Sequence, residues 1–109
     1  MAYDEVLAQR VRELLADRHD VREQRMFGGI AFMGGGHMTV GVINDDLMAR
    51  VGKDAHEELI AKPHAREMDF TKRPMDGFLY VGPEGVATKR QLRTWIDRCL
   101  AFTTSLPPK

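Results

Sequence analysis

The sequence predicts an α+β domain in which helices pack against an antiparallel sheet. Near both ends of the chain, apolar residues recur every three to four positions, as on one face of a helix. Between these stretches, short segments alternate apolar and polar residues and are separated by glycine-rich or polar turns. The expected order of elements is α-β-β-β-α-β-β-α. This order, with five expected strands, favours an antiparallel sheet over the alternating βαβ units of a parallel sheet.

Length and composition fit one ordinary globular domain. The chain has 109 residues, of which 43% are hydrophobic and 29% are charged, and both values are typical of folded proteins. We therefore expect a single domain over residues 1–109, with residues 103–109 forming a tail without stable contacts. The 16 basic and 16 acidic residues cancel, so the chain lacks the net positive charge of most nucleic-acid-binding domains.

The charges are unevenly distributed along the chain. Residues 1–61 hold 7 basic and 11 acidic side chains, whereas residues 62–109 hold 9 basic and 5 acidic ones. This asymmetry is compatible with a basic face near the C-terminus, with two complementary surfaces in a self-associating protein, or with a mixed solvated surface. We expect a cytoplasmic protein that does not contact membranes, because no signal peptide and no membrane-spanning run is present.

The first half of the chain predicts one helix followed by a meander of three strands. Residues 4–17 are expected to be helical, because Leu7, Val11, Leu14 and Leu15 form an apolar stripe. Residues 21–33 are predicted to form one long strand, with Gly28 and Gly29 marking a bulge or a close backbone approach inside it. The glycines at 34–36 then allow a tight turn. Two further strands are expected over residues 37–43 and 47–51.

The second half predicts two helices around a pair of short strands. A helix over residues 54–62 is expected to begin with a capping box of Asp54 and Glu57 and to end before Pro63. Strands are expected over residues 66–70, with Met68 and Phe70 facing inward, and over residues 78–81.

The last helix is the clearest element of the sequence. Thr88 and Gln91 have the spacing of a capping box at its start. A stripe of apolar residues follows at helical spacing: Leu92, Trp95, Ile96, Cys99 and Leu100.

Most candidate chemical sites are better explained as structure. The triple glycine is not followed by the lysine and helix of a phosphate loop, which favours a hairpin turn. The four histidines lack metal-ligand spacing, so we expect neither a metal nor a cofactor. Cys99, the single cysteine, excludes an internal disulfide and is expected to be a core residue, because no activating base is apparent.

Two sets of basic residues remain as candidate binding sites. Arg25 and Arg50 lie in or beside apolar strands, where an arginine either pairs with a carboxylate, such as Glu67 or Asp76, or anchors an anionic ligand. The last helix carries four basic residues that are candidates for contact with nucleic acid or for an ordinary solvated face. These four residues are Lys89, Arg90, Arg93 and Arg98.

Taken together, several motifs resemble the N-terminal domain of the TfoX/Sxy family. The motifs are the stretch Arg25-Met26-Phe27-Gly28-Gly29, a glycine turn, two β segments including Leu47 to Arg50, the strand Phe78-Leu79-Tyr80-Val81, and a closing helix with Trp95. The resemblance spans about residues 4–103 and implies a two-layer fold with a five-stranded antiparallel sheet. The family has no established catalytic residues, and the matching residues are expected to be fold markers.

The resemblance also implies a function. Named members of the family regulate competence genes in some bacteria alongside the cyclic-AMP receptor protein, and they carry a second, C-terminal helical domain. We expect a stand-alone domain that acts as a non-enzymatic regulatory or protein-binding module, with transcription machinery as a partner. Two alternatives stay open: a small-molecule or anion-binding domain using Arg25 and Arg50, and direct DNA binding through the last helix. Homo-oligomerisation through an open sheet edge is compatible with the regulatory module and with the small-molecule-binding domain.

Overall fold

The chain folds into three α-helices, one short 3₁₀ helix and six strands within its described part. The computed structural model describes residues 3–18, 21–26, 28–67 and 77–107, apart from the side chains of Met26 and Glu67. The elements are, in chain order, α1 (Glu5–Leu14), β1 (Val21–Met26), β2 (Gly29–Gly34), β3 (His37–Ile43), β4 (Asp46–Arg50), α2 (Lys53–Ile60), β5 (Ala65–Glu67), β6 (Phe78–Val81), η1 (Pro83–Val86) and α3 (Lys89–Thr103).

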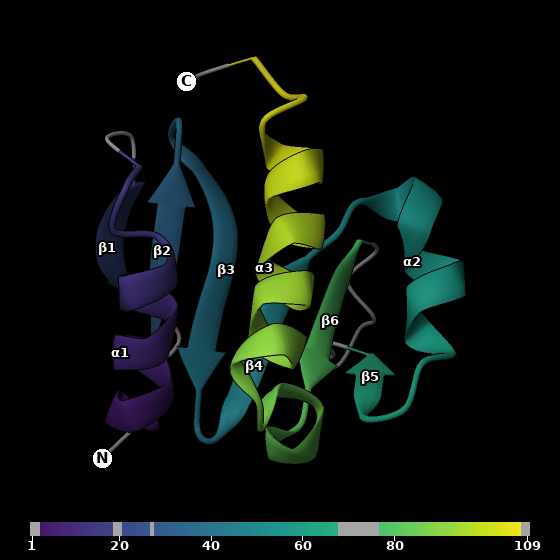
Figure 1. The fold of residues 1–109 in the computed structure, drawn as a ribbon. Coiled ribbons are helices and arrows are strands. Elements are labelled where there is room, and N and C mark those ends of the chain that lie inside the picture. The colour runs from purple at the N-terminus through teal and green to yellow at the C-terminus, as the bar shows by residue number, and fades with distance from the viewer. Residues whose placement is uncertain (1–2, 19–20, 27, 68–76, 108–109) are drawn as a thin grey trace.

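All six strands belong to one antiparallel sheet with the order β1-β2-β3-β4-β6-β5. Figure 1 shows α1 and α3 next to each other across one face of this sheet, with α2 beside β5 and β6. The predicted α+β class and the antiparallel arrangement are confirmed. The predicted number of five strands is wrong, because the first predicted strand is in fact two.

The long strand expected over residues 21–33 is a hairpin. β1 ends at Met26, and β2 begins at Gly29 and pairs with it in register, so that Met26 lies opposite Gly29 and Val21 opposite Gly34. Gly28 has φ +77°, a conformation that glycine adopts at little cost and that reverses the chain direction. Phe27 lies outside the described residues. The second glycine turn, at Gly35 and Gly36, is confirmed as the link between β2 and β3.

The main core lies between the helices and the sheet. The stripe of α3 provides Leu92, Trp95, Ile96 and Cys99, each at most 5% exposed. These side chains pack with apolar residues of α1, α2 and the central strands in one cluster. A smaller cluster around Met48 lies on the opposite face of the sheet, because neighbouring residues of a strand point to opposite sides.

The helix starts show where local sequence signals decide the structure. Asp4 caps α1 by accepting hydrogen bonds from two backbone amides, and α1 ends three residues earlier than expected. The predicted capping box of Thr88 and Gln91 is confirmed at the start of α3. The predicted capping box of Asp54 and Glu57 is wrong, because α2 begins one residue earlier and is preceded by Gly52, which offers no side-chain cap.

Other differences concern the short strands and the tail. The strand expected over residues 66–70 is observed as Ala65–Glu67, and its predicted inward residues Met68 and Phe70 lie outside the described residues. The strand expected at 78–81 is confirmed. In the described part of the expected tail, the Pro107 carbonyl oxygen lies 2.6 Å from Nε2 of His37, so the segment contacts the start of β3.

Two arginines of α1 tie this helix to distant parts of the fold. Arg12 makes a bidentate ion pair with Glu23 of β1, with nitrogen–oxygen distances of 2.6 Å. This pair lowers the pKa of Glu23 through the hydrogen bonds from Arg12. Arg10 donates a hydrogen bond of 2.8 Å to the carbonyl oxygen of Val86 in η1. The N-terminal helix is therefore anchored both to the edge of the sheet and to the segment before α3.

The β1–β2 hairpin gives a test based on neighbouring glycines. A methyl group at Gly29 would overlap the backbone carbonyl oxygen of Val42, whereas the space around Gly28 is open. We expect Gly29→Ala to lower the free energy of unfolding by about 2–3 kcal/mol, since the sheet must shift to accommodate the methyl group. Gly28→Asn should cost less than about 1 kcal/mol, because asparagine tolerates positive φ. Urea unfolding of both variants measures this difference, and equal costs would contradict the described turn.

Candidate functional site

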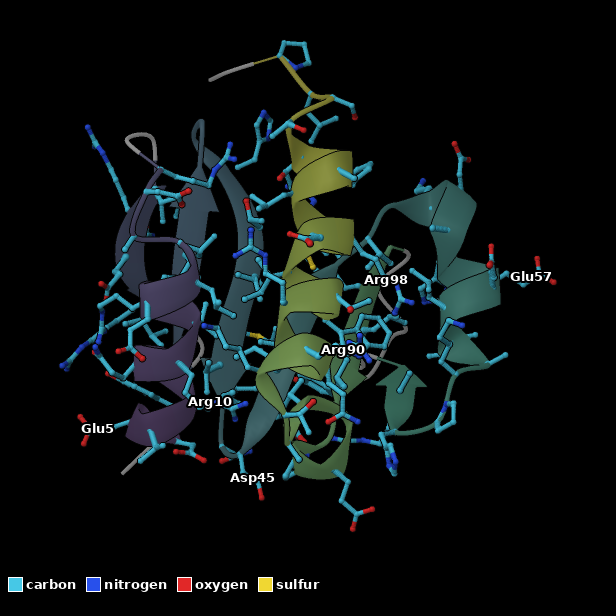
Figure 2. The ribbon with its side chains drawn as sticks, viewed as in Figure 1. Glu5, Arg10, Asp45, Glu57, Arg90 and Arg98 are labelled. Carbon is cyan, nitrogen blue, oxygen red and sulfur yellow. The ribbon has the colours of Figure 1, made fainter. Side chains whose placement is uncertain are left out.

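The four basic residues singled out on α3 lie along two different sides of the helix. Arg90 and Arg98 lie about two turns apart on the side of α3 that faces α2. Figure 2 shows both side chains between the two helices. Lys89 and Arg93 follow a neighbouring line, and Nε of Arg93 lies 3.3 Å from the carboxylate of Asp97. The structure therefore brings Arg90 and Arg98 together but does not form a continuous basic face from all four residues.

Arg90 and Arg98 line a hollow of about 440 Å³ between α3 and the connection from α2 to β5. Lys62 and Trp95 also line this hollow. Among the described residues, no carboxylate pairs with Lys62 or Arg90. The guanidinium carbon of Arg98 lies 4.7 Å from the centre of the Trp95 ring. The hollow thus presents positively charged side chains beside a largely buried indole.

A second hollow, of about 450 Å³, adjoins the first and shares Arg98 with it. Its apolar lining includes Leu59 of α2 and Phe102 of α3, and its polar lining includes the α2 carboxylates Asp54 and Glu58. We refer to the two hollows together as the α2–α3 groove. Since Asp54 lies beside the C-terminal half of α3 and Lys62 beside its N-terminal half, the two helices run in opposite directions along the groove (Figure 1).

Backbone geometry at Gly52 shapes the floor of the groove. Gly52 has φ +86°, and a Cβ atom at this position would collide with the Phe102 ring. The glycine therefore lets Phe102 pack directly against the start of α2. At the other end, α2 stops at Ile60, shortly before Pro63, and leaves Lys62 in the connection that faces α3.

His64 also lines the basic end of the groove. Its Nδ1 atom lies 3.7 Å from the carboxylate of Glu84, and both side chains are largely exposed. Lys62, Arg90 and Arg98 are the other basic side chains at this end. Such groups can hold and orient anions through charge-assisted hydrogen bonds.

The two strand arginines that were candidates for a shared anion site do not meet. Arg25 is exposed on β1, and Arg50 lies on β4, with β2 and β3 between them in the sheet. The guanidinium of Arg50 lies 5.4 Å from the ring centres of both Phe78 and Phe102. It also donates a hydrogen bond of 3.4 Å to the Met38 carbonyl oxygen.

Arg50 thus has a structural environment of its own. Asp76 and Glu67 were the candidate carboxylate partners of Arg50. Asp76 and the side chain of Glu67 lie outside the described residues. Among the described residues, two aromatic rings and a carbonyl oxygen lie near the Arg50 guanidinium. Ligand anchoring by either Arg25 or Arg50 stays a prediction.

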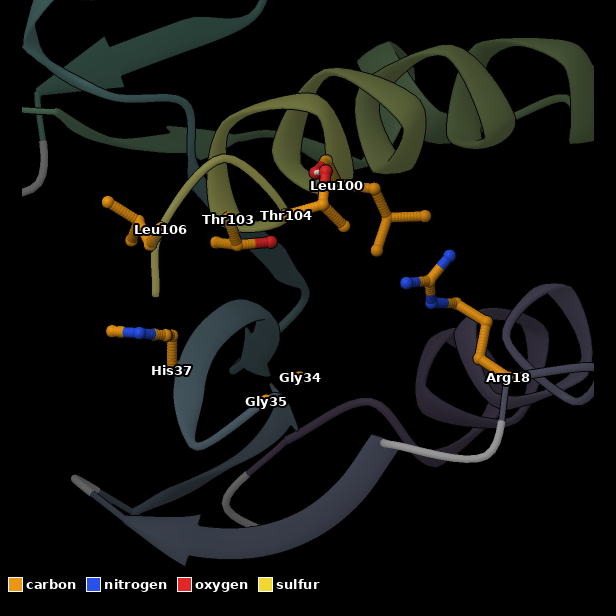
Figure 3. A pocket seen from close by; sticks show the side chains of 8 residues that line it. All are labelled: Arg18, Gly34, Gly35, His37, Leu100, Thr103, Thr104 and Leu106. Atoms are coloured by element: carbon orange, nitrogen blue, oxygen red, sulfur yellow. Dashed lines mark hydrogen bonds between the residues drawn. The ribbon is translucent and has the colours of Figure 1, made fainter. Parts of the chain in front are cut away.

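The triple-glycine turn borders a smaller hollow of about 150 Å³ beside the last turn of α3. Figure 3 shows Arg18, His37 and the hydroxyl of Thr103 around it. The C-terminal end of a helix carries partial negative charge, which disfavours anions. The Thr103 hydroxyl donates to the carbonyl oxygen of Cys99. These features agree with the interpretation of this segment as a turn rather than a phosphate loop.

Cys99 is buried in the main core, next to the sheet. Burial raises the pKa of its thiol to about 12, and the backbone hydrogen bond from Arg50 only partly opposes this shift. A thiol in this state is almost entirely protonated at neutral pH and is a poor nucleophile. The interpretation of Cys99 as a core residue is confirmed by its burial.

Comparison with known proteins identifies the family. The family model described as the TfoX N-terminal domain matches residues 13–103. The chain belongs to this family. No curated protein sequence and no solved structure gives a significant match.

The TfoX N-terminal match contains the whole of α2 and α3, so both walls of the groove belong to the family domain. It also contains the signature residues at 25–29 together with Arg50 and Trp95. In the part of the chain that the structure describes, no three histidine, cysteine or acidic side chains are arranged to bind a metal. None of the described helices combines the length and apolar character needed to cross a membrane.

Sequence reasoning missed half of the groove in this TfoX N-terminal domain. It singled out Arg90, Arg98 and Trp95 but not Lys62, nor the acidic residues of α2. The excess of basic residues after position 61 was the available signal for Lys62. The acidic end had no such signal, because its position opposite α3 depends on tertiary structure.

The surroundings of Arg50 predict that it stabilises the fold. We expect Arg50→Ala to lower the free energy of unfolding by about 1–2 kcal/mol, since two cation–aromatic contacts and the packing of the side-chain stem are lost. Arg25→Ala is the matched control and should change stability by less than about 0.5 kcal/mol, because Arg25 is exposed. Chemical denaturation compares the two. Equal effects would argue against the aromatic environment as the reason for Arg50.

The raised pKa of Cys99 predicts low reactivity and a specific pH dependence. A thiol reagent at pH 8 should label the denatured protein but not the folded one. Because the folded pKa is about 12 and thus above its ordinary value, the protonated thiol favours the folded state. Its contribution is complete below the unfolded pKa near 9 and is lost as the pH rises toward 12, at about 1.4 kcal/mol per pH unit. Cys99→Ala should remove this part of the alkaline destabilisation, and rapid labelling of folded protein would contradict the burial.

Proposed function

We propose that this TfoX N-terminal domain is a non-enzymatic regulatory module that acts by binding another protein through the α2–α3 groove. The observation that carries the proposal is the basic end of the groove, where Lys62 and Arg90 have no ion-pair partner among the described residues and lie near Trp95. Arginine and tryptophan are enriched at the energetically dominant positions of protein interfaces. Family membership supports a regulatory context.

The charges of the groove favour a protein over a nucleic acid as the partner. Lys62, Arg90 and Arg98 line one end, but Asp54 and Glu58 line the other. A nucleic-acid backbone is negative along its whole length and would meet repulsion at the acidic end. A polypeptide can present opposite charges to the two ends and apolar side chains to the floor between them.

The resemblance to regulators of competence genes suggests what kind of protein the partner is. We propose a component of the transcription machinery, encountered in the cytoplasm. The fixed cations of the groove suit recognition of acidic side chains, which form charge-assisted hydrogen bonds with guanidinium groups. Such contacts give specificity and fast association, as a regulatory interaction requires.

Two charge reversals on α3 test this proposal. Tagged wild-type protein should retain a defined protein from a lysate of its native host, identified by mass spectrometry. Arg90→Glu should reduce this retention at least about tenfold, because a cation at the basic end of the groove becomes a like charge for the acidic residues of the partner. Arg93→Glu makes the same change in charge outside the groove, at a residue paired with Asp97, and should retain the partner.

The same experiment separates the alternatives. Retention of the partner by Arg90→Glu would place the contact elsewhere on the domain. Nucleic acid in the eluate, released by moderate salt and absent with Arg90→Glu, would support direct DNA binding instead. An eluate that contains neither protein nor nucleic acid would favour the small-molecule interpretation, which a thermal-shift screen of anions with Arg25→Ala and Arg50→Lys variants would then examine.

A further inference from the structure

The α2–α3 groove has opposite charges at its two ends. The end near the start of α2 is lined by Asp54 and Glu58, both exposed. The end near the N-terminal half of α3 is lined by Lys62 and Arg90. Arg98 lies between the two hollows and lines both. The charge of the lining therefore changes sign along the axis of the groove. The charged residues form two separate ends and not one mixed cluster.

The floor between the charged ends is apolar apart from Arg98. Leu59 and Phe102 contribute to it in one hollow, and Trp95 in the other. The α3 residues that line the groove run from Arg90 to Phe102. This stretch corresponds to roughly 18 Å at the rise of a helix. A groove of this length accommodates a helix of about 12 residues or an extended segment of about 5 residues.

Three occupants can be compared on charge and shape. A nucleic acid is repelled by Asp54 and Glu58. A second copy of the domain would match the charges if the two grooves met in opposite directions, but two concave surfaces leave the space between them unfilled. A single polypeptide segment fills the groove and can place complementary charges at both ends. The shape and the charge pattern together favour this third occupant.

We propose that the groove binds a segment of a partner protein in one orientation, with acidic residues against Lys62 and Arg90 and basic residues against Asp54 and Glu58. Aliphatic or aromatic side chains in the middle of the segment contact the apolar floor. The pairing at each end disfavours the reversed orientation, which places like charges together at both ends. This inference rests on the proposed protein-binding function and adds the chemistry and direction of the bound segment.

His64 and Glu84 are further charged or titratable groups at the basic end. Nδ1 of His64 faces the Glu84 carboxylate at 3.7 Å, so this pair offsets part of the positive charge there. The orientation of the segment is therefore determined mainly by Lys62 and Arg90, which have no ion-pair partner among the described residues.

A random 15-residue peptide library displayed on phage, from which tryptophan is omitted, tests the inference on the whole chain. Wild-type protein should enrich peptides with an acidic cluster at one end, a basic cluster at the other and apolar residues between. Binding of synthetic versions is then followed by the fluorescence of Trp95, which is the only tryptophan of the chain and lines the groove. An order-reversed peptide with the same composition should bind at least about tenfold more weakly.

A charge-swapped protein gives the decisive comparison. The double variant Glu58→Arg with Arg90→Glu leaves one acidic and one basic residue at each end, beside Asp54 and Lys62, without changing the net charge, at two exposed positions. It should lose the preference and bind the peptide and its order-reversed version about equally. The control Glu57→Arg with Arg93→Glu makes the same exchange outside the groove lining, where Figure 2 shows Glu57 pointing away from α3. This control should keep the wild-type preference, and circular dichroism checks that both variants fold.

Three results would overturn the inference. Enrichment of uniformly acidic peptides would show that only the basic end recognises a partner. An unchanged preference in the charge-swapped protein would show that the ends do not determine orientation, and failure to enrich any peptide that alters Trp95 fluorescence would show that the groove is not a peptide site. These results differ from those expected if the protein-binding function proposed for the groove is itself wrong. In that case, the Arg90→Glu variant would still retain the protein captured from the lysate.

Discussion

The packing of α3 across the central strands is the contact on which the rest of the structure depends. Leu92, Trp95, Ile96 and Cys99 are almost completely buried beneath it, and each fully buried side chain of this size contributes about 1.5–3 kcal/mol relative to exposure. The same helix forms one wall of the groove with its adjacent side. Since the buried and the groove-lining residues alternate along one rigid helix, the sheet that holds α3 also determines where Arg90 and Arg98 are placed.

This arrangement connects the groove to the core through a few residues with two roles. Trp95 is part of the core cluster and also lines the basic hollow. Phe102 forms part of the groove floor while its ring also packs near the Arg50 guanidinium of β4. Substitutions at such residues change stability and binding together. The exposed charges at the groove ends are separable from the fold and are therefore the better positions for examining recognition.

Elements with strong local signals could be predicted from the sequence. The capping box at Thr88 and Gln91 and the apolar stripe that follows it identify α3 without tertiary information. The β1–β2 hairpin was misread as one strand, because the run of apolar and glycine residues continues through Gly28 and does not reveal its positive φ. The false capping box at Asp54 has a different cause. The sequence pattern is present, but α2 begins one residue earlier, after Gly52, where a Cβ atom would collide with the Phe102 ring. The groove could not be predicted as a unit, because its two walls are separated in sequence by two strands and only meet through the sheet.

The position of α3 as the last element of the domain has a further consequence, for synthesis on the ribosome. The β1–β4 meander is formed by neighbouring segments, whereas α1 packs against a helix about 75–95 residues later. At roughly 5–20 residues per second, this delay is about 4–19 s. A nascent chain therefore passes through a period in which the β1–β4 strands are complete but the part of their apolar face that α3 covers is still exposed.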